Sequence, residues 1–226
     1  VVYQRGPSPP HIAAGANLNF PVVGPLLRRG GAFFLRRSFK GEPLYAAVFN
    51  EYLHLLVSRG FSIEYFLEGT RSRSGRMLPP RTGILGMTLK SFLRGQERPL
   101  VFVPIYIGYE KLIEGKSFLG ELAGRPKGGE SLWSLLGTVR RLKHEFGKVH
   151  VNFGEPLYLA DYLDRRHAGW SEDGQQGEAE WLRPVTADLA LELIRRIGDS
   201  AVVNPINLVS LVLLATPKQA ADRSEE

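Results

Sequence analysis

The stretch that decides the fold is residues 62–73, which reads SIEYFLEGTRSR. Its first half, up to Leu67, is rich in aromatic and β-branched side chains and is typical of a buried β-strand. Glu68 and Gly69 follow, and two arginines then flank Ser72. Loops at the carboxyl ends of parallel strands are where α/β sheets bind ligands. The stretch therefore predicts a strand that delivers a basic loop to a ligand site.

The residues of this loop favour an anion as the ligand. Arg71 and Arg73 carry planar guanidinium groups that match the oxygen atoms of a phosphate in a bidentate manner. Gly69 would allow the backbone to approach the ligand closely. An arbitrary Arg-rich loop is more often merely solvated, but the position of this loop directly after an apolar strand favours an anion site.

Strands and helices alternate on both sides of this stretch. The sequence predicts an α/β fold class, a layered domain with a central, largely parallel or mixed sheet flanked by helices. In the helix over residues 43–59, one face is expected to be apolar and buried; it comprises Leu44, Val48, Tyr52, Leu55 and Leu56. Strands are expected at residues 31–35, 62–67, 99–109 and 149–153, and helices at residues 43–59, 84–94, 132–146 and 185–197.

Two of the other expected strands carry further candidate residues. The strand over residues 31–35 ends at Arg36 and Arg37, and if it neighbours the strand over residues 62–67, both strands would deliver arginines to one edge of the sheet. The strand over residues 99–109 contains Pro104, which cannot donate a ladder hydrogen bond, so an edge or a bulge is expected there.

Composition supports an anionic partner. The 226 residues include no Cys and carry a formal net charge of +6. Residues 1–98 hold 14 Lys and Arg against 5 Asp and Glu, whereas residues 99–226 hold 15 against 18. A basic half of this kind favours phosphate, nucleic acid or anionic lipid. The lack of Cys excludes disulfides and an acyl-cysteine intermediate within the chain.

The chain is expected to divide along its length. Residues 1–166 are predicted to form the main domain, 167–182 a linker, 183–216 a C-terminal helical segment and 217–226 a disordered tail. The apolar segment at residues 201–215 is shorter than the about 20 residues that a membrane span needs. The first residues lack Met and a signal peptide, and we expect the chain to begin inside a longer protein.

Three blocks together resemble the glycerol-3-phosphate and lysophosphatidate acyltransferase superfamily: residues 31–37 (GAFFLRR), 66–73 (FLEGTRSR) and 103–109 (VPIYIGY). The segments at residues 10–15 (PHIAAG) and 151–156 (VNFGEP) extend the resemblance to the large bacterial glycerol-3-phosphate acyltransferases.

The resemblance implies a function and a set of site residues. The reaction would transfer a fatty acyl group from acyl carrier protein or coenzyme A to the 1-hydroxyl of glycerol 3-phosphate, in phospholipid biosynthesis, without a cofactor or metal. The enzyme would lie peripherally on the cytoplasmic side of the bacterial inner membrane, on an anionic surface. The substrate-binding positions would be Arg37, Glu68, Gly69, Arg71, Ser72, Arg73 and, for the acyl donor or the shape of the site, Pro104.

One motif of that family has no counterpart in its expected place. The family uses a His followed, after four residues, by an Asp, where the His is the general base and the Asp orients its imidazole ring. His11 precedes the second block but has Ala16 at that spacing, while His150 and His167 have Glu155 and Glu172. We therefore expect no catalytic residue within the chain, a His–Asp pair upstream of Val1, and no acyltransferase activity from the chain alone.

The basic half of the chain has two alternative interpretations. Residues 70–98 hold 7 Lys and Arg against 1 acid, which would suit a nucleic-acid backbone. No nucleic-acid motif supports it, and Phe33, Phe34 and Phe66 are predicted to be core residues rather than stacking platforms, so no nucleic-acid partner is expected. A non-catalytic module that docks on anionic lipid is the second alternative, and it is compatible with the enzyme.

Overall fold

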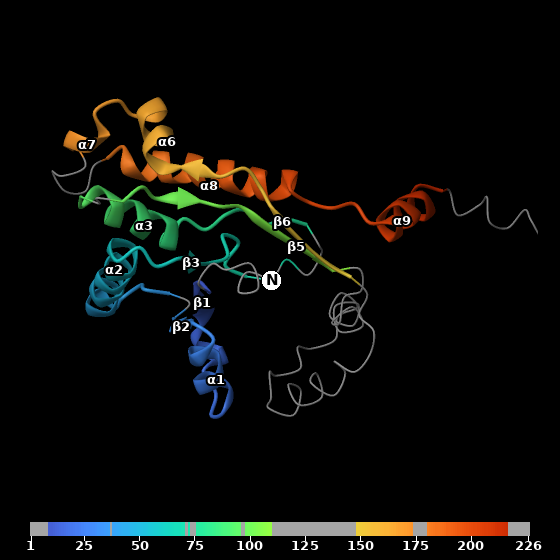
Figure 1. Ribbon diagram of the computed structural model, residues 1–226, viewed down its shortest axis with the longest axis horizontal. Coiled ribbons are helices and arrows are strands. Elements are labelled where there is room, and N and C mark those ends of the chain that lie inside the picture. Colours follow the sequence, from blue (N-terminus) through green and yellow to red (C-terminus); the bar gives the residue numbers. More distant parts are fainter. Residues whose placement is uncertain are drawn as a thin grey trace, which may run out of the picture. The chain divides into compact units, whose positions relative to one another are not determined.

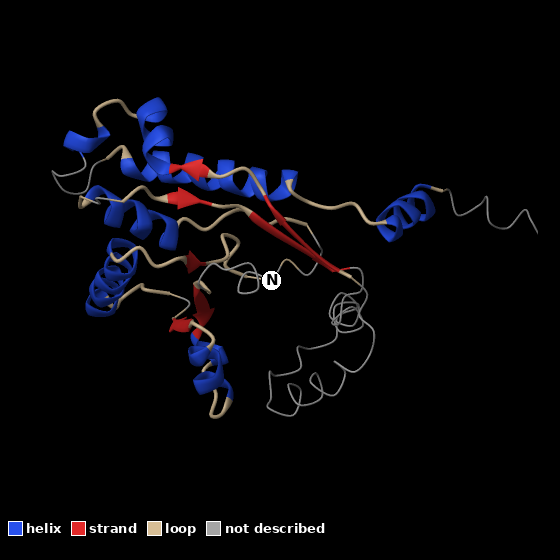
Figure 2. Cartoon of the chain, viewed as in Figure 1, coloured by secondary structure: helices blue, strands red, loops and turns tan. Residues whose placement is uncertain are grey.

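The computed structural model describes residues 9–36, 38–70, 72, 76–95, 98–109, 148–173 and 180–216 (Figure 1). The chain separates into two compact units, residues 1–103 with 155–195 and residues 104–154 with 196–226. The expected α/β class is confirmed, with a mixture of parallel and antiparallel strand pairs (Figure 2). The expected loop and helix between residues 115 and 146 lie outside the described residues. The division into a main domain, linker, helical segment and tail stays a prediction.

The first unit holds most of the elements. In chain order they are β1 (His11–Gly15), the 3-10 helix η2 (Ala16–Leu18), α1 (Val23–Arg29), β2 (Ala32–Leu35), α2 (Pro43–Ser58), β3 (Ile63–Glu64), α3 (Gly83–Leu93), β4 (Val101–Phe102), β7 (Leu157–Tyr158), α6 (Leu159–Arg166), α7 (Trp170–Asp173) and α8 (Leu182–Asp199), whose last turn belongs to the second unit. The second unit adds β5 (Ile105–Tyr109), β6 (Val149–Phe153) and α9 (Pro205–Ala215).

Three parallel strands form the sheet that carries the candidate site, in the order β2-β1-β3. Ile12 to Gly15 of β1 pair with Ala32 to Leu35 of β2, and on its other side Ile12 pairs with Glu64 of β3. β2 and β3 are not direct neighbours, as the sequence had left open, because β1 lies between them. A strand over residues 11–15 was only weakly indicated by the sequence, because HIAAG contains two alanines and a glycine, which have low strand propensity.

Helix α2 buries a different face from the one expected. Phe49, Leu53 and Leu56 are buried, at a spacing that forms one helical stripe, and α2 packs against α3. The expected stripe is mostly wrong, because Leu44 and Val48 are exposed and only Leu56 of that set is buried. Apolar residues lie on more than one side of this helix, so periodicity alone did not identify the packed side. Pro43 at its first turn and Gly60 after its end are as expected.

The expected continuous strand over residues 99–109 is in fact two strands. β4 pairs antiparallel with β7, and β5 pairs antiparallel with β6. Pro104 lies in the break between β4 and β5 and lacks the backbone N–H that a ladder needs. The strand was also expected to be covered on both faces, but Val103, Ile107 and Tyr109 are exposed.

Helices α3, α6 and α8 supply most of the remaining core of the first unit. Leu85 and Leu89 of α3, Leu159 and Leu163 of α6 and Leu189 of α8 are fully buried. α3 lies against α8 at Gly86, where a Cβ atom would make an ordinary van der Waals contact of 3.7 Å with Cγ2 of Thr186. The expected helices at residues 84–94 and 185–197 are confirmed, with α8 starting three residues earlier.

The packing of α2 predicts opposite outcomes for two leucines on the same helix. Leu53 is 0% exposed and Leu44 is 77% exposed. Leu53→Ala should lower the free energy of unfolding by about 2–5 kcal/mol, because it leaves a cavity. Leu44→Ala should change it by less than about 0.5 kcal/mol. Urea unfolding followed by circular dichroism measures both values, and a larger loss in Leu44→Ala than in Leu53→Ala would show that the other face of α2 is the packed one.

Candidate anion-binding site at the carboxyl edge of the parallel sheet

The parallel sheet brings two candidate segments to one edge. β1, β2 and β3 run in the same direction, so the chain leaves β2 and β3 at the same end of the sheet. Two strands separated by a third are about 10 Å apart. Two Arg side chains extending toward each other from such segments can reach one phosphate-sized ligand. This edge is where an α/β sheet provides a binding site.

After β2, one of the two arginines is already engaged. The guanidinium of Arg36 forms an ion pair with Glu42 and lies 4.9 Å from the ring centroid of Tyr45. The backbone N–H of Arg36 donates a hydrogen bond of 3.2 Å to the hydroxyl of Tyr45. Arg36 therefore fastens the end of β2 to the start of α2. Arg37, the residue expected to bind the substrate, lies outside the described residues.

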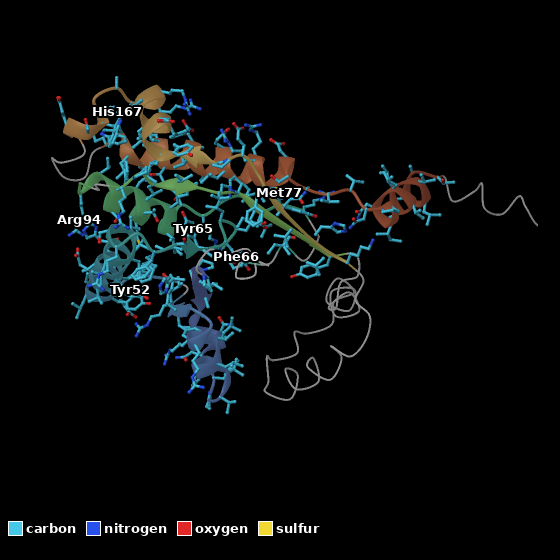
Figure 3. All side chains as sticks on the ribbon, viewed as in Figure 1. Tyr52, Tyr65, Phe66, Met77, Arg94 and His167 are labelled. Carbon is cyan, nitrogen blue, oxygen red and sulfur yellow. The ribbon has the colours of Figure 1, made fainter. Side chains whose placement is uncertain are left out.

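After β3, the chain alternates its side chains between the core and solvent. Tyr65 and Phe66 are labelled in Figure 3, on the segment that leads from β3 to the loop. Burial raises the pKa of the Tyr65 phenol well above its ordinary value, and its hydroxyl lies beside Thr88 of α3. Leu67 is buried, whereas Phe66 is 64% exposed. The expectation that Phe66 is a core residue is wrong, because the ladder ends at Glu64 and Phe66 falls on the open side.

Glu68 closes the base of the basic loop. Its Oε2 accepts a hydrogen bond of 3.1 Å from the backbone N–H of Leu78, ten residues along the chain. One position earlier, the carbonyl of Leu67 accepts a hydrogen bond of 2.7 Å from the backbone N–H of Arg81. A carboxylate would repel a phosphate, so Glu68 suits a role in holding the loop better than a role in touching the ligand. The two hydrogen bonds fix both ends of the loop.

Gly69 is needed for its backbone conformation and for space. Its φ of 62° lies in the left-handed region, and its N–H donates to the carbonyl of Phe66 at 3.0 Å. A Cβ atom at this position would lie 2.7 Å from Cδ of Arg81. Any other residue would therefore displace the Arg81 side chain. Ser72 is half-buried, while Arg71 and Arg73 lie outside the described residues.

Pro104 belongs to the second unit, where it is buried. Its carbonyl accepts a hydrogen bond of 2.8 Å from the backbone N–H of Gly154, just beyond the end of β6. A Cβ atom on Gly154 would lie 3.2 Å from Cβ of Pro104 and 2.5 Å from Oγ of Ser200. The contacts of Pro104 are therefore those of a residue that shapes the start of the β5–β6 pair.

Histidines that were considered as bases have packing contacts. The ring of His11 meets Phe61 edge-on at 5.0 Å between centroids. Nδ1 of His54 lies 2.9 Å from Oγ of the buried Ser91 and links α2 to α3. His167 stacks on Trp181 at 4.4 Å. These contacts suit structural histidines. Over the described ranges, no group of three or more His, Asp or Glu side chains could hold a metal ion.

Arg81 lies beside the candidate site although no motif in the sequence pointed to it. The hydrogen bond to Leu67 and the close approach to Gly69 place it at the base of the loop. A signal was present, because Pro79 and Pro80 precede it and restrict the chain on its return.

The chain is similar in sequence to known acyltransferases. A family described as "Acyltransferase" matches residues 1–108, and a family described as "Glycerol-3-phosphate acyltransferase C-terminal region" matches residues 118–225. A protein of Pseudomonas aeruginosa named glycerol-3-phosphate acyltransferase is 57% identical over 99% of this chain. Proteins of the same name from Pseudomonas putida (strain KT2440) and Ectopseudomonas mendocina are 55% identical over 98% of this chain. This chain spans 27% of the length of each of these relatives.

The order of the blocks, the parallel sheet that brings two of them to one edge and these matches lead to one conclusion: the chain belongs to the bacterial glycerol-3-phosphate acyltransferase family.

Proposed function

We propose that this chain carries the acceptor-binding part of a glycerol-3-phosphate 1-O-acyltransferase. In the complete reaction, the 1-hydroxyl of glycerol 3-phosphate attacks the thioester carbonyl of acyl carrier protein or coenzyme A, and the thiol leaves. One observation carries the proposal: the segments that follow β2 and β3 leave the sheet at the same edge. The substrate-binding set would be Arg37, Glu68, Gly69, Arg71, Ser72, Arg73 and Pro104.

The residues of this set would have different roles. Arg37, Arg71 and Arg73 would neutralise the phosphate, which carries a charge of about −1.5 to −2 near neutral pH. Glu68 would act indirectly, since its hydrogen bond to the Leu78 N–H holds the loop. An organised loop loses less conformational entropy when the ligand binds. Binding energy at the phosphate would then position the distant hydroxyl for attack.

Membrane contact is proposed through α9 and the basic half of the chain. Every residue of α9 is exposed, and Ile206, Leu208, Leu211 and Leu214 are among them. Asn204 and Asn207 form a capping box at its start, with Pro205 in the first turn. An 11-residue helix is only marginally stable alone in water, so a surface that covers its apolar side chains would stabilise it. Among the described helices, none is long and apolar enough to cross a membrane.

A peripheral position on the cytoplasmic side of the bacterial inner membrane suits these features. Basic residues near an anionic leaflet contribute about 1 kcal/mol each, and the first 98 residues are strongly basic. The acyl product is a lipid, so docking at this surface would place the site where its product belongs. The proposed role in phospholipid biosynthesis follows from the reaction.

The acceptor site predicts a specific kinetic effect of Arg71. In the protein that contains this stretch together with the catalytic His and Asp, Arg71→Ala should raise the KM for glycerol 3-phosphate by roughly one to two orders of magnitude, because a charged hydrogen bond is lost. The KM for the acyl donor should change little, and Arg71→Lys should restore part of the loss. Steady-state assays with each substrate varied in turn provide the measurement.

Arg94 is the matched control for Arg71. Its guanidinium is 2.6 Å from Oε1 of Glu51, which links α3 to α2 away from the loop, so Arg94→Ala should leave both KM values unchanged. If Arg71→Ala instead raised only the KM for the acyl donor, the assignment of the acceptor site would be wrong.

The membrane proposal predicts that α9 is the contact. Leu214→Asp should reduce the fraction of protein that sediments with anionic vesicles by about tenfold or more, since burial of a Leu side chain contributes about 1.5–3 kcal/mol. Leu44→Asp is the control, because Leu44 is almost as exposed as Leu214, at 77% against 85%. Equal losses in both variants would contradict a specific role of α9. Vesicle binding that does not change with salt concentration or with lipid charge would contradict the proposed electrostatic contribution of the basic half.

A further inference from the structure

We propose that Arg81 is an additional phosphate-binding residue of the acceptor site. The lack of a side chain at Gly69 would leave room for the Arg81 side chain there. The inference deepens the proposed function and rests on it. It adds a residue from outside the three blocks that pointed to the family, and it places a basic residue at the end of the loop that begins with Glu68.

The position of Arg81 is fixed by its own backbone. Its N–H donates a hydrogen bond of 2.7 Å to the carbonyl of Leu67, which precedes Glu68 and Gly69. The neighbouring hydrogen bond from the Leu78 N–H to Glu68 holds the same two chain segments together. Arg81 therefore lies beside the start of the basic loop although it follows Glu68 by 13 residues and Gly69 by 12 along the chain.

The side chain of Arg81 runs across Gly69. A Cβ atom on Gly69 would be 2.7 Å from Cδ, 3.3 Å from Nε and 3.6 Å from Cγ of Arg81. The aliphatic stem and the first nitrogen of the guanidinium thus lie directly against the glycine that opens the loop. A side chain held by packing in this way loses little rotamer entropy when its guanidinium binds an anion.

The guanidinium of Arg81 is available for a ligand. It is exposed and makes no hydrogen bond or ion pair within the described ranges of the chain. Three other arginines of the first unit are already engaged: Arg36 pairs with Glu42, Arg94 with Glu51, and Arg98 donates to the carbonyl of Arg59. Glu68, the acid closest in position, already accepts the hydrogen bond from Leu78.

The chemistry favours a phosphate over a carboxylate ligand. A phosphate dianion offers three oxygen atoms and near two units of charge, so it can accept hydrogen bonds from several guanidinium groups at once. An Arg at the base of the loop would add one more positive charge to the proposed set of Arg71 and Arg73, which suits a phosphate dianion better than a singly charged carboxylate.

Arg98 is a matched control that separates the packing of an Arg side chain against a glycine from the use of its charge. Its side chain also crosses a glycine with positive φ, since Nη1 would lie 2.4 Å from a Cβ atom on Gly60. Its guanidinium, however, donates to the carbonyl of Arg59 at 3.4 Å, at the end of α2. Arg81 and Arg98 therefore share the packing against glycine and differ in whether the charge is already used.

The test is a titration of the 226-residue chain with glycerol 3-phosphate, followed by calorimetry, with Arg81→Met, Arg81→Lys and Arg98→Met. Methionine keeps an apolar stem and removes the charge. Arg81→Met should weaken binding about ten- to hundred-fold, Arg81→Lys should restore part of it, and Arg98→Met should bind as the unsubstituted chain does. Glycerol, which lacks the phosphate, should bind all four proteins equally weakly.

Urea unfolding of the same proteins separates charge from packing. A loss of affinity in Arg81→Met that Arg81→Lys does not restore, together with a lower urea midpoint of unfolding, would overturn the inference. Arg81 would then have a structural role only. Unchanged binding by Arg81→Met, beside measurable binding of glycerol 3-phosphate by the unsubstituted chain, would overturn it too and leave the proposed function standing. A chain that does not bind glycerol 3-phosphate at all would overturn both.

Discussion

The pairing of β1 with both of its neighbours is the constraint on which the candidate site depends. The backbone N–H of His11 donates to the carbonyl of Ser62 at 2.7 Å, and that of Ile12 donates to the carbonyl of Gly31 at 2.9 Å. These hydrogen bonds make the three strands parallel and fix their register. Because parallel strands end at one edge, the two basic segments that follow β2 and β3 emerge together there although about 30 residues separate them.

A second constraint acts at the loop itself. Hydrogen bonds from the backbone of Leu78 and Arg81 to Glu68 and Leu67 close it at its base. Tyr65 anchors the segment between β3 and the loop, because its phenol is buried next to Thr88 of α3. The carboxylate of this motif thus acts on the loop through structure, while the charges that would meet an anion belong to arginines. One short motif therefore combines the carboxylate that holds the loop, a glycine in the left-handed region and the arginines proposed to bind the phosphate.

The sequence could predict those features that depend on local chemistry. Helices α2 and α3 were expected with accurate ends, because Pro43 starts the first and the glycines at positions 60 and 95 follow the two helices in left-handed conformations. The strand over residues 149–153 was also expected, since it is short, apolar and followed by a Gly and a Pro. The basic loop after an apolar strand was visible for the same reason.

What the sequence by itself determined was the α/β class, most of the helices and the order of basic blocks, because propensity, capping and turn residues act within a few positions. Only the tertiary structure decided that HIAAG is the central strand, that Leu53 rather than Leu44 faces the core, and that Arg81 returns to Gly69. Those outcomes depend on partners that are distant in the chain. A weak strand forms when both edges find hydrogen bonds, and a helix with several apolar sides buries whichever side meets its neighbour.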